Sequence, residues 1–370
     1  MVFITSSIFF LLFLSLASRK FGQQYSDTLY HDTCSLDLFR FMTNYGGHSL
    51  SHLMFLNDKF GYWAARRSVY FSFQKKGKRM IVLGDPIGDE QLFQDAMREL
   101  QEDCEKNKIK SPVFYQISAK YMHLYDQYAY RTIKIGEEAK VSLKDFSLTG
   151  KQGAKLRSSR NKFQREGFIF KVVYPPYSQV QLEEIKEVSD QWIGKRAEKG
   201  FSVSFFHEDY VSKFPIALMY NSDHNLIAFA TLPSHQADQE KTIHIDLMRY
   251  IPNSPNGTMD VLFTSIFFWA KELNYDYCSL GMAPLSNVGN CEDSNSFYEK
   301  LGQVIFNHGE VFYKFKGLKK YKAKFATHWE PRYIAYKNIS IIGVLFRLVL
   351  LVHKTTLITK HWPIIMKRAS

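Results

Sequence analysis

In the stretch Thr242-Ile243-His244-Ile245-Asp246-Leu247-Met248-Arg249-Tyr250, polar and apolar side chains alternate as far as Leu247, which predicts a β-strand. An apolar helix over 258–273 and a short strand over 277–280 are expected after it, and residues 226–233 predict a strand that pairs with it. This order of elements is typical of an α/β unit. Asp246 and Arg249 come at the end of the first strand, where functional side chains often lie.

The first part of the chain predicts a second unit of the same kind. Strands are expected over 68–73 and 79–83, joined by a Gly-containing turn, followed by a helix over 89–106 and a strand over 112–117. A chain of 370 residues is too long for one ordinary core. We therefore expect an apolar membrane segment at 1–25, a first domain at 26–150, a second domain at 151–336 and a basic amphipathic tail at 337–370.

The net charge of +12 is concentrated in two places. Thirteen Lys and Arg stand against two Glu between residues 310 and 370, and a second basic cluster surrounds Lys155, Arg157 and Arg160 on an expected helix. Such clusters favour a polyanionic partner, either nucleic acid or anionic lipid. Solvated helix faces are the alternative for each cluster.

Both ends of the chain carry apolar runs. Residues 2–17 are followed by Arg19 and Lys20, and the run is shorter than the ~20 residues that span a bilayer. We interpret it as the end of a transmembrane helix with the following chain in the cytoplasm, and a cleaved signal is the alternative. Residues 339–352 predict a helix that either lies on an anionic membrane or packs back on the domain.

No cofactor is indicated by the sequence. The four cysteines are widely spaced and lack nearby histidines, so neither a disulfide framework nor a metal site is predicted. No Gln/Arg-x-x-Gly-x-Gly/Ala phosphate loop follows a central strand, which argues against transfer from acetyl-coenzyme A.

Four islands between Ile243 and Tyr336 carry a family resemblance. They are Asp246-Leu247-Met248-Arg249-Tyr250, Pro255-Asn256-Gly257-Thr258-Met259-Asp260, Ser279-Leu280-Gly281-Met282-Ala283-Pro284-Leu285-Ser286 and Trp329-Glu330-Pro331-Arg332-Tyr333. In this order they resemble the C-terminal part of the bacterial phosphatidylglycerol lysyltransferase (multiple peptide resistance factor) family.

The resemblance implies an α/β fold made of tandem acetyltransferase-like (GNAT-like) domains, the second of them catalytic. It also implies transfer of an amino acid, lysine rather than alanine, from aminoacyl-tRNA to the glycerol hydroxyl of phosphatidylglycerol at the cell membrane. The product lowers the negative charge of the membrane and gives resistance to cationic antimicrobial peptides. Because the aminoacyl ester is already activated, neither ATP nor a metal nor a coenzyme is required.

Site residues follow from the resemblance and from the residue types. Asp246 is expected to bind the substrate ammonium, and Arg249 a phosphate or the oxyanion; from the residues alone, a structural ion pair is the alternative. Asn256, Gly257 and Asp260 begin an expected helix, so they predict either an anion site or a plain helix cap. Ser286 contacts substrate or merely forms a turn.

The remaining candidates lie near the C-terminus. Glu310, before a strand expected over 311–315, is the preferred proton acceptor, ahead of His308; a surface carboxylate is the alternative. Lys324, Glu330 and Arg332 are assigned to the substrate by the resemblance. With Lys155, Arg157 and Arg160, residues on an expected basic helix over 317–325 are predicted to contact tRNA, namely Lys319 and Lys320.

Two rival functions remain open. A peptidoglycan-bridge aminoacyltransferase would share the fold and the tRNA donor, although the second and fourth islands favour the lipid enzyme. A membrane-docked module that binds RNA or lipid without catalysis would need only the basic tail.

Overall fold

The computed structural model describes residues 35–151, 153–237, 240–287 and 309–353. The predicted membrane segment 1–25 and most of the tail lie outside these ranges. Within them, no helix has both the length and the apolar character needed to cross a bilayer.

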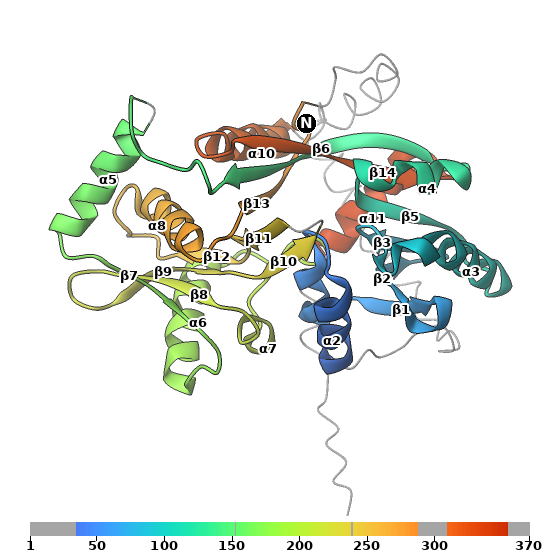
Figure 1. Cartoon of the computed structure of the whole chain (residues 1–370), viewed down its shortest axis with the longest axis horizontal. Helices are drawn as coiled ribbons and strands as arrows, with labels where there is room; N and C mark the ends of the chain where they lie inside the picture. The colour runs from blue at the N-terminus through green and yellow to red at the C-terminus, as the bar shows by residue number, and fades with distance from the viewer. Residues whose placement is uncertain (1–34, 152, 238–239, 288–308, 354–370) are drawn as a thin grey trace, which may run out of the picture.

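A large sheet runs through both predicted domains (Figure 1). β13 and β6 join the two parts of it, and β14 lies between β5 and β6, although it comes last in sequence. The strands in spatial order are β1 (Phe60–Ala64), β2 (Val69–Lys76), β3 (Arg79–Leu83), β5 (Lys110–Ser118), β14 (His328–Tyr336), β6 (Arg131–Ser142), β13 (Tyr277–Pro284), β11 (Glu240–His244) and β10 (Ser234–Ala237), with β4 (Ile87–Gly88) beside β2.

A second sheet of four antiparallel strands belongs to the later part of the chain. Its order is β12 (Met248–Tyr250), β9 (Leu226–Thr231), β8 (Ile216–Tyr220) and β7 (Ile169–Val173). The helices are α2 (Ser35–Tyr45), α3 (Phe93–Lys106), α4 (Met122–Gln127), α5 (Ala154–Arg165), α6 (Gln179–Ile193), α7 (Glu208–Val211), α8 (Thr258–Glu272), α10 (Gly309–Lys322) and α11 (Ile341–Val352), with a 3₁₀ helix η1 (Ser51–Leu56) after α2.

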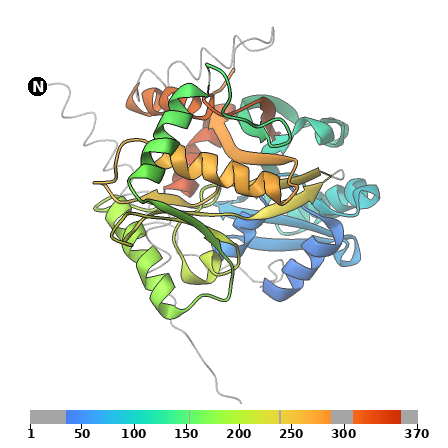
Figure 2. The same cartoon turned by 60° about the vertical axis from the view of Figure 1, so that its left-hand side comes forward.

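Three hydrophobic clusters hold these layers together. One lies under α3, whose Phe93, Met97 and Leu100 recur at helical spacing and are fully buried on β2, β3 and β5. Another surrounds α8, which packs between the two sheets and against α5 (Figure 2). The third joins η1, α7, β8 and α11. Each buried Leu or Phe contributes about 1.5–3 kcal/mol to folding.

Most of the predicted elements are present. The 68–83 hairpin, the helix after Asp89, the strand before Ser118 and the apolar helix after Gly257 all form. The strand expected over 311–315 was wrong, because these residues belong to α10. A short apolar run cannot distinguish strand from helix, and here the run continues into the helical Lys-rich segment.

The fold is also compatible with the two acetyltransferase-like units, and the chain is an α/β protein of that class. The division of the chain near residue 150 stays a prediction, since one sheet takes strands from both sides of it.

The described part of the tail is a helix with two apolar faces. Ser340 caps α11 by accepting a hydrogen bond from the Gly343 amide at 3.2 Å. Its inner face packs on the core through four buried residues, Ile341, Val344, Leu348 and Leu351. Its outer face consists of Ile342, Phe346 and Val349, which are exposed. Of the two alternatives for this helix, packing on the domain is therefore correct for the inner face of α11. The outer face is exposed and can still contact a membrane.

Candidate active site

The strand predicted over 242–250 is divided into two strands that belong to different sheets. β11 pairs in parallel with β13, whereas β12 pairs with β9. The last bond between the two parallel segments runs from the Ile245 amide to the Ser279 carbonyl at 3.0 Å. Beyond Ile245 and Ser279 the two segments separate, and we call this region the fork. From here β13 continues beside β6, whereas the chain after Ile245 turns to pair with β9. Asp246 lies at the fork, outside any strand, so strand alternation does not fix its direction relative to Arg249.

The Asp246 carboxylate is bound on both oxygens. Oδ2 accepts a hydrogen bond from the Tyr210 hydroxyl at 2.5 Å and a longer one from Thr231 at 3.4 Å. Oδ1 lies 3.2 Å from Nε2 of His52, and both of these side chains are 10% exposed. Burial alone would raise the pKa of Asp246, but the attraction of His52 and hydrogen bonds from His52, Tyr210 and Ser204 lower it instead. Asp246 is therefore ionised and already holds several protein donors.

Arg249 has different partners. Its Nη2 donates to both oxygens of Glu198, at 2.8 and 3.0 Å, and its guanidinium stacks 4.2 Å from the ring centre of Trp192. Arg249 is buried, and its Nη1 has no hydrogen-bond partner among the described residues. No ion pair joins Asp246 to Arg249 in this part of the chain; the ion pair of Arg249 is with Glu198 instead.

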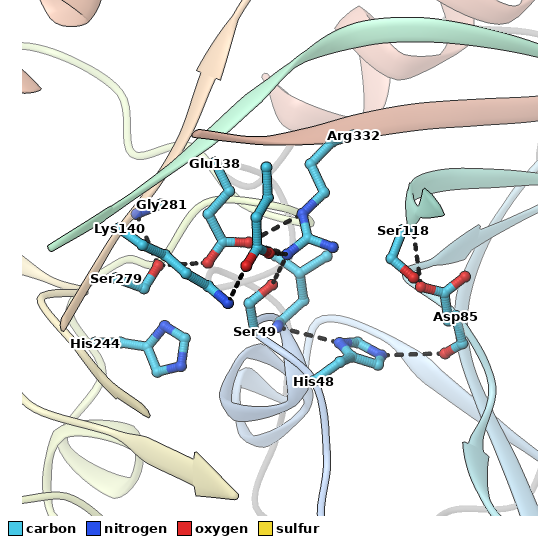
Figure 3. A network of polar contacts seen from close by, with 12 residues as sticks. His48, Ser49, Asp85, Ser118, Glu138, Lys140, His244, Ser279, Gly281 and Arg332 are labelled. Carbon is cyan, nitrogen blue, oxygen red and sulfur yellow. Dashed lines mark hydrogen bonds and ion pairs between the residues drawn. The ribbon is translucent and has the colours of Figure 1, made fainter. Parts of the chain in front are cut away.

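A second network lies across β6, β13 and β14 (Figure 3). Arg332 donates through Nε to Glu138 at 2.9 Å and again through Nη2, and it reaches Ser49 at 3.3 Å. Ser279, at the fork, donates to the other oxygen of Glu138. Burial would raise the pKa of Glu138, but the charge of Arg332, followed by His244 and Lys140, brings it well below its usual range. Arg332 thus joins β14 to the fork through a buried ion pair.

Glu330 lies at the rim of this network. It accepts from Arg332 at 3.3 Å and pairs with Lys140 at 2.5 Å, while its own side chain is 42% exposed. Of the two predicted residues on β14, Arg332 is buried in the network and Glu330 can reach solvent.

Four histidines surround the fork. His235 and His244 share a hydrogen bond of 2.6 Å between Nδ1 and Nε2, and the ring of His52 lies 5.1 Å from that of His244. Burial lowers the pKa of His235 to about 4 and that of His244 further. His48 accepts from the Leu50 amide through Nδ1 and contacts the Asp85 carbonyl through Nε2; burial and Arg332 lower its pKa to about 3. These three imidazoles are neutral at physiological pH.

Lys322, on α10, faces the fork from the other side. Its Nζ donates to the carbonyls of Gly281 and Met282 at 3.0 Å each, where the pairing of β13 with β6 is irregular. Burial lowers the pKa of Lys322 to about 8, against the attraction of Glu138. The resemblance did not point to this residue.

Two further candidates from the sequence hold a neighbouring turn. Ser286 is buried and donates to Glu137 at 2.9 Å, and Asn287 donates to the same carboxylate at 2.8 Å. Lys319 in turn donates to Asn287 at 2.6 Å. Ser286 and Lys319 therefore take part in one structural network around Glu137.

The start of α8 is packed against α5. Gly257 has a φ of +95°, which favours glycine, and a side chain there would meet Ser159 of α5 at 3.4 Å. Asn256 is exposed, and Asp260 pairs with Lys324 at 3.2 Å. The predicted anion site thus lies between the basic helix α5 and Lys324.

The basic helix α5 presents one polar face to solvent. Lys155 is exposed, Arg157 donates to the Gly150 carbonyl at 3.3 Å, and Arg160 stacks 4.3 Å from the ring centre of Phe268. A shallow hollow of about 570 Å³ is lined by Ala154, Arg157, Ser158, Asn161, Gln164 and Arg165. Lys320, on α10, is also exposed.

Some predictions cannot be placed. Glu310 lies in the first turn of α10 rather than before a strand, and its side chain and His308 are outside the described residues. Within the described ranges, no three His, Cys, Asp or Glu side chains are placed to hold a metal ion.

The sequence interpretation missed several partners of the candidates, among them His52 and Tyr210, which contact Asp246, Glu198, which contacts Arg249, and Glu138, which contacts Arg332. It also missed Lys322, which donates to the backbone of the third island. Tyr210 and Glu198 stand in segments without a motif. Lys322 lay inside the basic helix expected over 317–325, but nothing in the sequence indicated that its side chain would be buried.

Comparisons with known proteins give a consistent result. The family described as phosphatidylglycerol lysyltransferase, C-terminal, matches residues 39–336. The phosphatidylglycerol lysyltransferase of Bacillus subtilis (strain 168) is 42% identical over 321 residues, which are 86% of this chain and 37% of the relative. That of Staphylococcus aureus (strain COL) is 35% identical over 303 residues, 82% of this chain and 36% of the relative. The chain thus spans little more than a third of these relatives' length.

Solved structures agree on the fold. The structure of L-PGS from Bacillus licheniformis has a TM-score of 0.77 and 39% identity, covering 86% of this chain and 97% of that chain. The C-terminal domain of a protein assigned as a lysylphosphatidylglycerol synthetase from Agrobacterium fabrum has a TM-score of 0.74 and 31% identity, covering 86% and 98%. FemX, with a TM-score of 0.54 and 8% identity, covers 86% and 99% and shares the fold alone.

Proposed function

The chain belongs to the phosphatidylglycerol lysyltransferase C-terminal family, and from this premise we propose that it transfers an amino acid from aminoacyl-tRNA to the glycerol hydroxyl of phosphatidylglycerol. The site at the fork supports the proposal. An ester exchange needs a hydroxyl held near the acyl carbon, donors for a developing oxyanion and a group that moves one proton. Ionised Asp246 bound to an imidazole, beside the strand ends, is the observation that carries it.

Lysine is the proposed amino acid, because the relatives at 35–42% identity bear the lysyl name. Lysine esterified to phosphatidylglycerol adds two ammonium groups to a lipid with one phosphate. Its accumulation would therefore lower the negative charge of the membrane and its attraction for cationic antimicrobial peptides. Glu330 is a partly exposed carboxylate at the rim of the site, suited to one of the ammonium groups.

The lipid phosphate is assigned to Arg249. Its Nη1 is a buried donor without a partner in the described structure, and such a donor is costly to leave unpaired. A phosphodiester oxygen would satisfy it while Nη2 keeps its contacts with Glu198. Lys324, which follows α10, pairs with Asp260 in the first turn of α8 and does not contact Arg249.

The tRNA is assigned to the basic face formed by α5 and the exposed part of α10. Lys155, Arg157 and Arg160 lie on the first helix, and Lys320 on the second. Phosphate contacts of this kind release counterions, so affinity falls steeply with salt. We expect the rate of transfer to fall in parallel when the tRNA concentration is below saturation.

The membrane is assigned to the tail and to the outer face of α11. Ile342, Phe346 and Val349 form an exposed apolar stripe, and Lys354, Lys360, Lys367 and Arg368 follow in the sequence. An apolar stripe with basic flanks suits the surface of an anionic membrane. The catalytic part would then work on the cytoplasmic side of the cell membrane, where aminoacyl-tRNA is present.

The experiment uses the 370-residue chain with lysyl-tRNA labelled in the amino acid and vesicles of phosphatidylglycerol. We expect label in the chloroform-soluble lipid, and less of it as salt rises. Label found in a cell-wall precursor supplied in parallel, and not in lipid, would favour the peptidoglycan-bridge reaction. Equal lipid labelling from free lysine and ATP without tRNA would overturn the donor assignment.

A further inference from the structure

His52 is held rigidly at the fork. It lies on η1, whose neighbours Leu53, Phe55 and Leu56 are buried in the core. The start of η1 is fixed by two hydrogen bonds, from the Ser51 amide to the His48 carbonyl at 3.0 Å and from the His48 amide to the Ser51 hydroxyl at 2.8 Å. A side chain on such a segment is preorganised, because its backbone cannot shift without disturbing the core.

The contact with Asp246 determines which nitrogen of His52 carries the proton. Asp246 is ionised and can only accept hydrogen bonds, so Nε2 of His52, at 3.2 Å, must be the donor. In the neutral imidazole Nδ1 then keeps its lone pair. Nδ1 has no hydrogen bond to any described residue, and 10% of the His52 side chain is exposed to solvent. A carboxylate that orients an imidazole with a free basic nitrogen is the arrangement used by general bases.

The other three histidines of the fork do not have this arrangement. His235 and His244 bond to each other, and His48 has both nitrogens engaged with the backbone. Only His52 among the four pairs with a carboxylate. The charged or titratable groups that face His52 and its partner are Asp246, His244, His235, His48, Lys59 and Tyr210.

We propose that His52 is the general base of the transfer and Asp246 its positioning residue, an inference that rests on the proposed function. Nδ1 takes the proton of the lipid glycerol hydroxyl as its oxygen forms a bond to the acyl carbon. The tetrahedral intermediate then breaks the bond between that carbon and the ribose oxygen. The imidazolium returns its proton to the ribose oxygen, so no proton or electron is gained or lost overall.

This assignment changes the role of two residues named from the sequence. Asp246 was expected to bind the substrate ammonium, yet its oxygens are already bound by His52 and Tyr210. Orienting the imidazole uses these contacts as they stand. Glu310 is then not needed as a proton acceptor. The substrate ammonium would instead be bound by a partly exposed carboxylate such as Glu330.

The test compares His52→Gln and His52→Ala with the unaltered chain, using lysyl-tRNA and phosphatidylglycerol vesicles. We expect kcat to fall by about a hundredfold or more, as is usual when a general base is removed, while KM for tRNA changes by less than about threefold. Added imidazole should restore part of the rate of His52→Ala. The acid limb of the pH profile of kcat/KM should disappear in both variants.

The control is His123→Gln, a change at an exposed position on α4, which should leave the rate and the pH profile unaltered. A His52→Gln chain that keeps its circular dichroism and works within about threefold of the unaltered rate would overturn the inference. So would a loss that appears only in KM and is not rescued by imidazole. If the unaltered chain itself makes no aminoacyl lipid, the proposed function fails; if it does and the variants do too, only the role of His52 fails.

Discussion

The buried pair of Glu138 and Arg332 gives a prediction whose size can be worked out from the structure. In Glu138→Gln the volume is kept and the charge is lost, so Arg332 keeps a buried guanidinium without its main counter-charge. Breaking a buried pair in this way typically costs about 3–5 kcal/mol. The amide oxygen of Gln can still accept one hydrogen bond from Arg332, and Glu330 lies 3.3 Å away. We therefore expect the lower end, a loss of about 3 kcal/mol in the free energy of unfolding.

The matched control is Glu330→Gln. Glu330 contacts the same guanidinium but is 42% exposed, and exposed pairs contribute about 1 kcal/mol or less. Urea unfolding would be followed by tryptophan fluorescence and by circular dichroism, since coincident curves are needed before a single free energy is extracted. Equal losses in the two variants, or a loss below about 1 kcal/mol in Glu138→Gln, would refute the reasoning.

The pH dependence of the free energy of unfolding tests independently whether the charge of Glu138 stabilises the fold. The pKa of Glu138 is depressed below its ordinary value of 4.5, so the pair stabilises the fold fully above that value. As the pH falls below it, the unfolded state takes up a proton that the folded state does not, and the stabilisation is lost. The difference between the unaltered chain and Glu138→Gln should therefore stay constant from pH 7 to just above pH 4.5 and shrink as the pH falls further below 4.5. A difference that grows on acidification would contradict the assignment of charge.

Three further predictions concern the fork, α10 and α11. Asp246→Asn and Arg249→Lys should keep the fold and lower the rate of transfer by about a hundredfold, or ~3 kcal/mol, with rate and thermal midpoint measured on the same samples. Variants that are unstable but active would show that both residues have a structural role only. The pKa of Lys322 falls from 10.5 to about 8 on folding, so its burial costs stability below pH 8 and the cost disappears between pH 8 and 10.5. Relative to Lys322→Met, the unaltered chain should thus gain about 3 kcal/mol over that range in urea unfolding, and no gain would contradict it. Phe346→Glu should weaken co-sedimentation with phosphatidylglycerol vesicles, whereas Phe39→Glu, exposed on α2, should not; equal effects would remove α11 from the membrane surface.

Local signals account for the elements that the sequence predicted. The hairpin of β2 and β3 has a glycine in its turn, Gly77, with a φ of +60°. The helix α3 shows its apolar face at helical spacing. By contrast, the break between β11 and β12 was not predicted, because Ile245 and Leu247 are both buried and continue the alternation past the end of β11; it is interrupted only at Met248, where β12 begins.

The site itself was only half predictable. Asp246, Arg249 and Arg332 were found through their islands, but their partners lie far away in sequence. His52 comes from the first part of the chain and Glu138 from β6, and they reach the fork because the large sheet joins the two parts. A contact made only by tertiary packing cannot be seen in local periodicity or in a motif.

The central claim is tested most directly by mass spectrometry of the lipid formed from phosphatidylglycerol vesicles, lysyl-tRNA and the 370-residue chain. The account predicts lysyl-phosphatidylglycerol in an amount equal to the lysyl-tRNA deacylated by the enzyme, and none with phosphatidylcholine vesicles, which lack the glycerol hydroxyl. Deacylation of the tRNA without an aminoacyl lipid, or no reaction at all by the folded chain, would contradict it.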